Sequence, residues 1–275
     1  MRSQVASTGA MRSLFDIGQC PGSKTVYATI LPSYDHKRNK MPEKEELAAR
    51  VTKQLARAAK LRSSALSNPK TAAARQRLRV WQSERLARTH ADLLANPRFE
   101  EAAKFFLTDV YSVDDSSSRD AEVQRVAPMM PKFLSDAALE TAADAIELDA
   151  LSEDLDAAMV TALGPRLTSL SAADYGRAYR KVDRRRDRAR QINLIEHLGQ
   201  SLERLTHQRF IATTLAIMRK PAKLAGLGDL QSFLERGFAA FKKMGNSDEF
   251  LTLLVTRERN LLKALFAGDD RLLGK

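Results

Sequence analysis

The chain has 275 residues, of which 44% are hydrophobic, and its 45 Lys and Arg against 34 Asp and Glu give a net charge of +11. One Cys and four His argue against a disulfide framework and against a cysteine-rich zinc site, and the scarcity of cysteine fits a cytoplasmic protein. No apolar run reaches a length of about 18 residues, so the sequence predicts no transmembrane helix and no membrane partner.

The net charge is distributed unevenly along the chain. It is +4 over residues 1–40, +7 over 41–100, −10 over 101–160 and +10 over 161–275. This order predicts that the acidic segment packs against the basic segments, which would neutralise much of the positive potential internally. The excess of Lys and Arg is therefore weak evidence for a nucleic-acid partner.

Residues 1–40 contain Gly, Pro and polar residues without a periodic pattern, and we predict a disordered leader. Met41 precedes Pro42 and a helical pattern, which is typical of a natural start and would place the leader upstream of it. An organellar transit peptide is the alternative interpretation. Residues 41–270 are predicted to form a single all-α domain of eight to nine helices.

Two helices are predicted over 43–66 and 70–95. The short link at Asn68-Pro69 should join them into an αα-hairpin. Trp81 falls on the apolar face of the second helix. We place it in the core, with ligand stacking as the alternative.

A central helix is predicted near 97–111, where Asn96-Pro97 provides an N-cap and a first helical residue. Its end is aromatic, in a chain with only 6% aromatic residues. Phe105 falls outside the apolar arc, so the helix should be covered on two sides. Asp109 would then be partly enclosed and would need a cation or several donors.

The stretch 105–111, Phe-Phe-Leu-Thr-Asp-Val-Tyr, resembles the motif of the FFLEELY-motif family, which comprises helical bacterial proteins of uncharacterised function. The resemblance covers residues 41 to about 267 and includes the downstream pattern Arg119-Asp120 and Arg125-Val126-x-Pro128-x-Met130. Four positions carry the same residue as the family motif: Phe105, Phe106, Leu107 and Tyr111. Thr108 departs from the family's first glutamate, which puts any chemical role of that glutamate in doubt. The resemblance implies a helical fold and no particular activity.

An acidic helix is predicted over 136–162. Its carboxylates should lie on a solvated face or, alternatively, against a row of basic residues on the helix that comes next in the chain. Ser171 caps a long helix near 172–205. The apolar side of this helix changes between its two halves. Because neither Gly nor Pro interrupts 177–198, we predict one straight helix with different partners along its length.

The first half of the long helix carries a row of cations on its outer side: Arg177, Arg180, Lys181, Arg184, Arg185 and Arg188. Regularly spaced cations suit a phosphate backbone, so this basic stripe is the candidate polyanion-binding site. No aromatic residues interleave with it, and a solvated or internally paired face is the alternative. Arg186 instead falls on the apolar face between tyrosines. We therefore predict a structural ion pair of Asp109 with Arg125 or Arg186.

The C-terminal part is predicted to contain a helix over 207–219, which ends before Pro221. A hairpin of two helices follows, over 229–244 and from 247 onward. The apolar faces of this hairpin either close the core or form a homodimer.

The common sequence signatures of enzymes and cofactor sites do not occur. Glu-x-x-His pairs, phosphate-binding glycine loops and nucleophile elbows are missing, so we predict no catalytic residue, no metal and no cofactor. The leading hypothesis is a non-catalytic protein that acts through protein–protein contacts. Polyanion or nucleic-acid binding through 177–188 is the second, and an enzyme with a pocket near Asp109, Tyr111 and Arg186 is the third.

Overall fold

The computed structural model describes residues 44–110 and 117–274, and within these ranges all regular secondary structure is helical. Nine of the helices in these ranges have at least seven residues. The predicted all-α class is therefore confirmed. The prediction of a leader over 1–40 falls outside the described residues.

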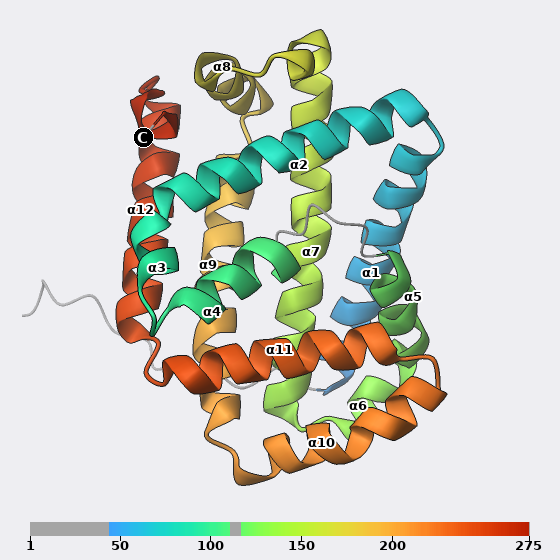
Figure 1. The fold of residues 1–275 in the computed structure, drawn as a ribbon. Helices are drawn as coiled ribbons and strands as arrows, with labels where there is room; N and C mark the ends of the chain where they lie inside the picture. Colours follow the sequence, from blue (N-terminus) through green and yellow to red (C-terminus); the bar gives the residue numbers. More distant parts are fainter. Residues whose placement is uncertain (1–43, 111–116, 275) are drawn as a thin grey trace, which may run out of the picture. The chain divides into compact units, whose positions relative to one another are not determined.

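The α-helices of the described part are α1 (Lys44–Leu66), α2 (Pro69–Thr89), α3 (Ala91–Ala95), α4 (Glu100–Phe105), α5 (Ser117–Val126), α6 (Met130–Phe133), α7 (Asp136–Leu163), α8 (Ala172–Val182), α9 (Arg185–Thr206), α10 (Arg209–Leu224), α11 (Gly228–Met244) and α12 (Asp248–Phe266). Four long helices form a row in the order α1, α7, α9 and α12, each in contact with the next (Figure 1). α2 and α11 run across this row, and α10 packs on α11 and α9.

Polar caps fix where several helices begin. The side-chain oxygen of Asn68 accepts from the amide of Lys70 at 3.0 Å, with Pro69 as the first residue of α2. Ser135 and Ser171 cap α7 and α8 with their hydroxyl groups. These caps agree with the starts predicted for α2 and α8.

The predicted straight helix over 172–205 is interrupted, which corrects that prediction. α8 ends at Val182, Asp183 adopts a left-handed conformation with φ of 49°, and α9 begins at Arg185. Aspartate tolerates this conformation better than most residues, so a helix can end there without glycine or proline. The turn resets the helical phase, which accounts for the change of apolar side between the two halves.

α10 also continues beyond its predicted end, through Pro221 to Leu224. A proline inside a helix removes the hydrogen bond to the carbonyl four residues earlier, here that of Ile217. Ile217 and Pro221 are both exposed, so water can satisfy this carbonyl and the helix tolerates the proline.

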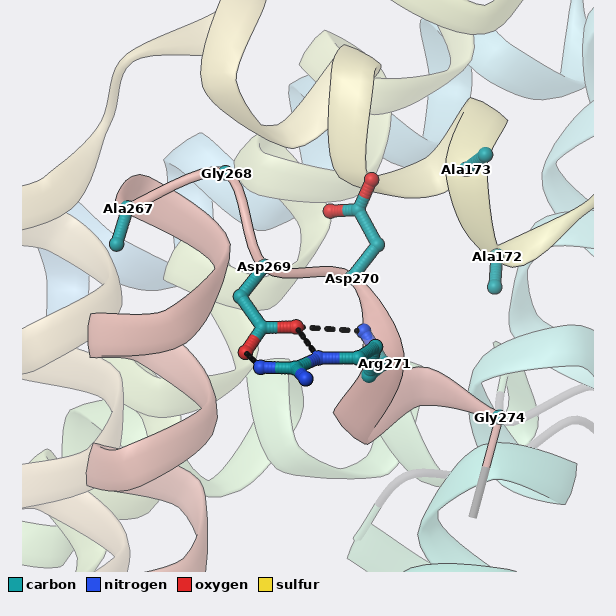
Figure 2. A pocket seen from close by; sticks show the side chains of 8 residues that line it. All are labelled: Ala172, Ala173, Ala267, Gly268, Asp269, Asp270, Arg271 and Gly274. Atoms are coloured by element: carbon teal, nitrogen blue, oxygen red, sulfur yellow. Dashed lines mark hydrogen bonds and ion pairs between the residues drawn. The ribbon is translucent and has the colours of Figure 1, made fainter.

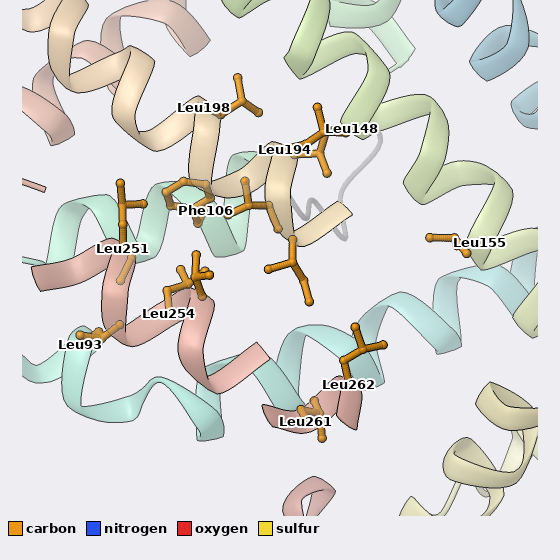
Figure 3. Packing of buried hydrophobic residues seen from close by; sticks show 14 of the residues in the cluster. Leu93, Phe106, Leu148, Leu155, Leu194, Leu198, Leu251, Leu254, Leu261 and Leu262 are labelled. Carbon is orange, nitrogen blue, oxygen red and sulfur yellow. The ribbon is translucent and has the colours of Figure 1, made fainter. Parts of the chain in front are cut away.

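The predicted central helix lies in the core. α4 continues into a π-helical turn over Phe106–Val110, and Phe106 is only 3% exposed. Its ring packs among leucines of α9 and α12 (Figure 3). The rings of Phe241 and Phe250 each lie 6.0 Å from it, centroid to centroid. The C-terminal hairpin of α11 and α12 thus closes the core around this helix.

Trp81 also belongs to the core, as predicted. Its ring stacks on Tyr175 of α8 with 4.4 Å between the centroids, and it packs against the main apolar cluster. The stack joins α2 to α8.

α7 carries a ladder of carboxylates that face other helices. Six acids take part: Asp144, Glu147, Asp149, Glu153, Asp154 and Asp156. Their partners come from α1, α2, α9 and the residue just before α9: Arg50, Arg57, Arg62, Arg75, Arg79, Arg184, Arg190 and His197. The prediction of a solvated acidic face is therefore wrong. The alternative, docking onto the basic stripe, holds only for Arg184, because most partners come from α1 and α2.

Glu153 has the most partners in this ladder. It pairs with Arg62, Arg75 and Arg79, and its side chain is 2% exposed. Burial lowers the pKa of the Arg75 guanidinium to about 10. Removing one member of a buried ion cluster leaves the others without compensation, which costs about 3–5 kcal/mol.

A second buried ion pair joins α2 to α12. Glu258 pairs with Arg85, and its carboxylate lies 3.1 Å from Nε2 of His90 just after α2. Burial alone would raise the pKa of Glu258, but Arg85 and His90 outweigh burial and lower this pKa to about 2. We did not predict this pair, although Glu258 falls between Leu254 and Leu261 on the apolar face of the last helix.

We expect Glu153→Gln to lower the free energy of unfolding by about 3 kcal/mol, because three guanidinium groups lose their shared carboxylate. Urea unfolding followed by circular dichroism measures this change. Glu140→Gln is the matched control, since Glu140 lies on α7 without a cation partner among the described residues. The control should change stability by less than about 0.5 kcal/mol. Equal effects of the two substitutions would contradict the role assigned to the ladder.

Glu258 should make stability depend on pH in the acid range. Its pKa is lowered from 4.5 to about 2 by folding, so its stabilisation is present above pH 4.5 and is lost as the pH falls toward 2. We expect Glu258→Gln to cost roughly 3 kcal/mol at pH 7 and to flatten the acid limb of the stability curve. Urea unfolding between pH 2 and 7 tests this. An acid limb as steep as that of the wild type would show that Glu258 is not its source.

Candidate interaction site

α10 is attached to the bundle by only one face. Of its 16 residues, only Ala222 is buried. The side-chain amide of Gln231 on α11 donates to the carbonyl of Leu215 at 2.7 Å. Nε of Arg219 donates to Glu235 of α11 at 2.9 Å. These contacts fix the inner face of α10 and thereby determine which residues point outward.

Three large apolar side chains form a ridge on the outer face of α10. Phe210, Ile217 and Leu224 are 81%, 67% and 90% exposed. Each is seven residues from the next, so the three lie nearly on one line along the helix. We call this set the α10 ridge. Isolated exposed apolar residues are common, but an aligned row of them is typical of a contact surface.

The α10 ridge is accompanied by cations. Arg209, Lys220 and Lys223 are exposed. Lys223 lies close enough to Glu235 of α11 to help lower the pKa of that carboxyl, whereas Arg209 and Lys220 have no carboxylate partner among the described residues. The sequence contains no Asp or Glu between Arg204 and Gly228. This face of the protein is therefore both apolar and basic. We did not single it out from the sequence, although the seven-residue spacing of the ridge was a visible signal.

The FFLEELY-like stretch lies in the core rather than at a surface. Phe105 and Phe106 are 6% and 3% exposed, and Leu107 is half-buried. Phe105 packs against α11 at Gly237, where an added Cβ would lie 2.8 Å from its ring. α11 thus covers the second side of the central helix. Tyr111 lies outside the described residues.

Asp109 follows this stretch and finds its cation on α11. Its half-buried carboxylate pairs with Arg236. Arg236 takes the place of the predicted partners, because Arg125 binds elsewhere. The guanidinium of Arg125 donates to the carbonyls of Ala225 and Gly226 at 3.2 and 2.7 Å, which ties α5 to the turn after α10.

Arg186, the other predicted partner of Asp109, is exposed. The interruption at Asp183 explains the difference, since it shifts the phase of α9. Arg188 faces the tyrosines instead, and its guanidinium lies 4.8 Å from the ring centroid of Tyr179. Burial raises the pKa of the Tyr179 hydroxyl above its usual value.

Most cations of the predicted polyanion-binding stripe have partners within the protein. Arg180 binds Asp270 at 2.7 Å, Arg184 binds Asp154 at 2.8 Å, and Arg188 is buried. The other three are exposed: Arg177 pairs with Asp174, Arg185 lies over the ring of Phe266, and Lys181 points to solvent. The stripe therefore presents fewer available cations than its sequence suggests.

An open surface hollow of about 660 Å³ lies where α8 meets the C-terminal segment (Figure 2). Small residues and Asp269, Asp270 and Arg271 line it. Asp269 binds Arg271, and Asp270 binds Arg180, so the charged groups are already engaged. This hollow does not assemble a set of catalytic groups.

Two further findings concern the residues that the structure describes. Among them, no group of His, Cys, Asp and Glu is arranged to hold a metal ion. No helix within these ranges combines the length and the apolar character needed to cross a bilayer.

Comparison with known proteins identifies one family. No curated protein and no solved structure matches the chain. The model of a family described as a domain of unknown function, DUF8198, matches residues 61–272, from the end of α1 to the turn that follows α12. Since this match covers most of the chain, the protein belongs to the DUF8198 family.

Proposed function

We propose that this protein is a non-catalytic protein of the FFLEELY type that acts by binding a partner through the α10 ridge. The observation that carries the proposal is the exposure of Phe210, Ile217 and Leu224 on a helix whose other face is docked. Burying one such side chain contributes about 1.5–3 kcal/mol, so three aligned ones provide a substantial source of affinity.

The packing of the motif supports a structural role for it. Phe105 and Phe106 hold α4 against α11 and α12, and Asp109 is paired with Arg236. These residues stabilise the fold that presents α10. In this proposal 41–270 is one cytoplasmic domain, which the compact unit Pro42–Lys275 and the scarcity of cysteine support.

The two alternative functions have less support. Polyanion binding through 177–188 is weakened because Arg180, Arg184 and Arg188 are held by internal contacts. An enzyme near Asp109 is weakened because Arg186 is exposed on another helix and Asp109 is bound by Arg236.

Affinity purification with mass spectrometry, from cells that produce the protein, tests the proposal. We expect the partner that co-purifies with the wild type to be lost with Phe210→Ser/Ile217→Ser/Leu224→Ser. Leu66→Ser is the control, because Leu66 is 69% exposed on α1. Circular dichroism should show that both variants remain folded. The same co-purifying molecules for all three forms would contradict the proposal.

A further inference from the structure

α10 has the composition and the placement of a helix that lies flat on a surface. Its 16 residues span about 24 Å, and one side of this length is docked on α11 while the other carries the α10 ridge. An interfacial helix combines outward Phe, Leu or Ile with Lys and Arg beside them. At 100° per residue, Lys220 lies about 60° and Arg209 about 80° from the middle of the ridge, so both flank it.

The charge of this face limits what can cover it. Arg209 and Lys220 have no carboxylate partner among the described residues, and the segment from Arg204 to Gly228 contains no acid. A second copy that used the same face in a two-fold contact would bring these cations together. The charge therefore favours an anionic occupant.

The shape of this face favours a deformable occupant. The α10 ridge projects from a helix with 15 of its 16 residues at least partly exposed. Two surface hollows of the described part of the chain lie elsewhere, beside α8 and between α1 and α5. A projecting ridge enters a lipid headgroup layer without a preformed groove, whereas a protein partner must supply a groove that matches it.

We infer that the α10 ridge, together with Arg209 and Lys220, binds the surface of an anionic phospholipid bilayer. This inference rests on the proposed function and names the partner. The apolar side chains enter the boundary between headgroups and acyl chains, and the cations contact the phosphates. Binding of this kind is peripheral and needs no membrane-spanning helix. It revises the prediction of no membrane partner that the sequence alone gave.

Sedimentation of the full chain with large unilamellar vesicles tests the inference. We expect binding to phosphatidylcholine vesicles that contain phosphatidylglycerol, weakened by added salt, and little binding to phosphatidylcholine alone. Phe210→Ser/Ile217→Ser/Leu224→Ser should weaken binding more than about tenfold. Arg209→Glu/Lys220→Glu should weaken it by about tenfold or more.

Arg177→Glu/Lys181→Glu is the matched control, because it makes the same change of net charge at exposed positions of α8. It should retain most of the binding. An equal loss in both charge variants would show general attraction and overturn the inference.

Other outcomes separate the inference from the proposed function. If the wild type does not bind anionic vesicles but the ridge variant loses a co-purifying protein, the lipid inference falls and the proposed function stands. If the wild type instead forms a dimer that the ridge variant abolishes, a second copy is the occupant and the lipid inference is wrong. If the ridge variant keeps both vesicle binding and its co-purifying molecules, both proposals fall.

Discussion

The fold depends on neutralising the acidic helix α7 inside the bundle. Asp144, Glu153 and Asp156 are at most 7% exposed, and buried carboxylates without partners would be very costly. Arginines from α1 and α2 and His197 of α9 pair with them, so these helices must lie beside α7. Apolar packing alone would tolerate other neighbours. The charge pairs favour this arrangement, because moving α1 or α2 away from α7 would leave buried acids unpaired.

This internal neutralisation also decides what the surface can do. The net charge of +11 includes many arginines that pair with the acids of α7. It is therefore a poor measure of the electrostatic potential at the surface. The predicted basic stripe illustrates this, since Arg184 is held by Asp154 and Arg188 is buried. α10 differs, because Arg209 and Lys220 have no carboxylate partner among the described residues and the apolar side chains of its ridge are exposed. The arginines that stand out in the sequence thus mainly stabilise the fold. The proposed binding surface lies on α10, whose pattern stands out less.

The sequence was sufficient for features that depend on local period and capping. These include the all-α class, the start of α2 at Asn68-Pro69 and the buried aromatic helix around Phe106. The sequence was insufficient where a single residue changed the helical phase. Asp183 interrupts the helix, although no Gly or Pro predicts an interruption there. The sequence also could not choose Arg236 over Arg125 or Arg186 for Asp109, because that choice depends on how α11 crosses α4. The α10 ridge was missed because its periodic pattern looks like that of a buried helix.

The proposed function and the lipid inference both place binding on the outer face of α10. Hydrogen–deuterium exchange of the full chain, with and without anionic vesicles, tests this placement most directly. We expect slower exchange over Arg209–Leu224 when vesicles are present and unchanged exchange over Ala172–Val182, which carries part of the basic stripe. Protection of α8 instead of α10, or no protection of α10 by vesicles or by any co-purified partner, would contradict it.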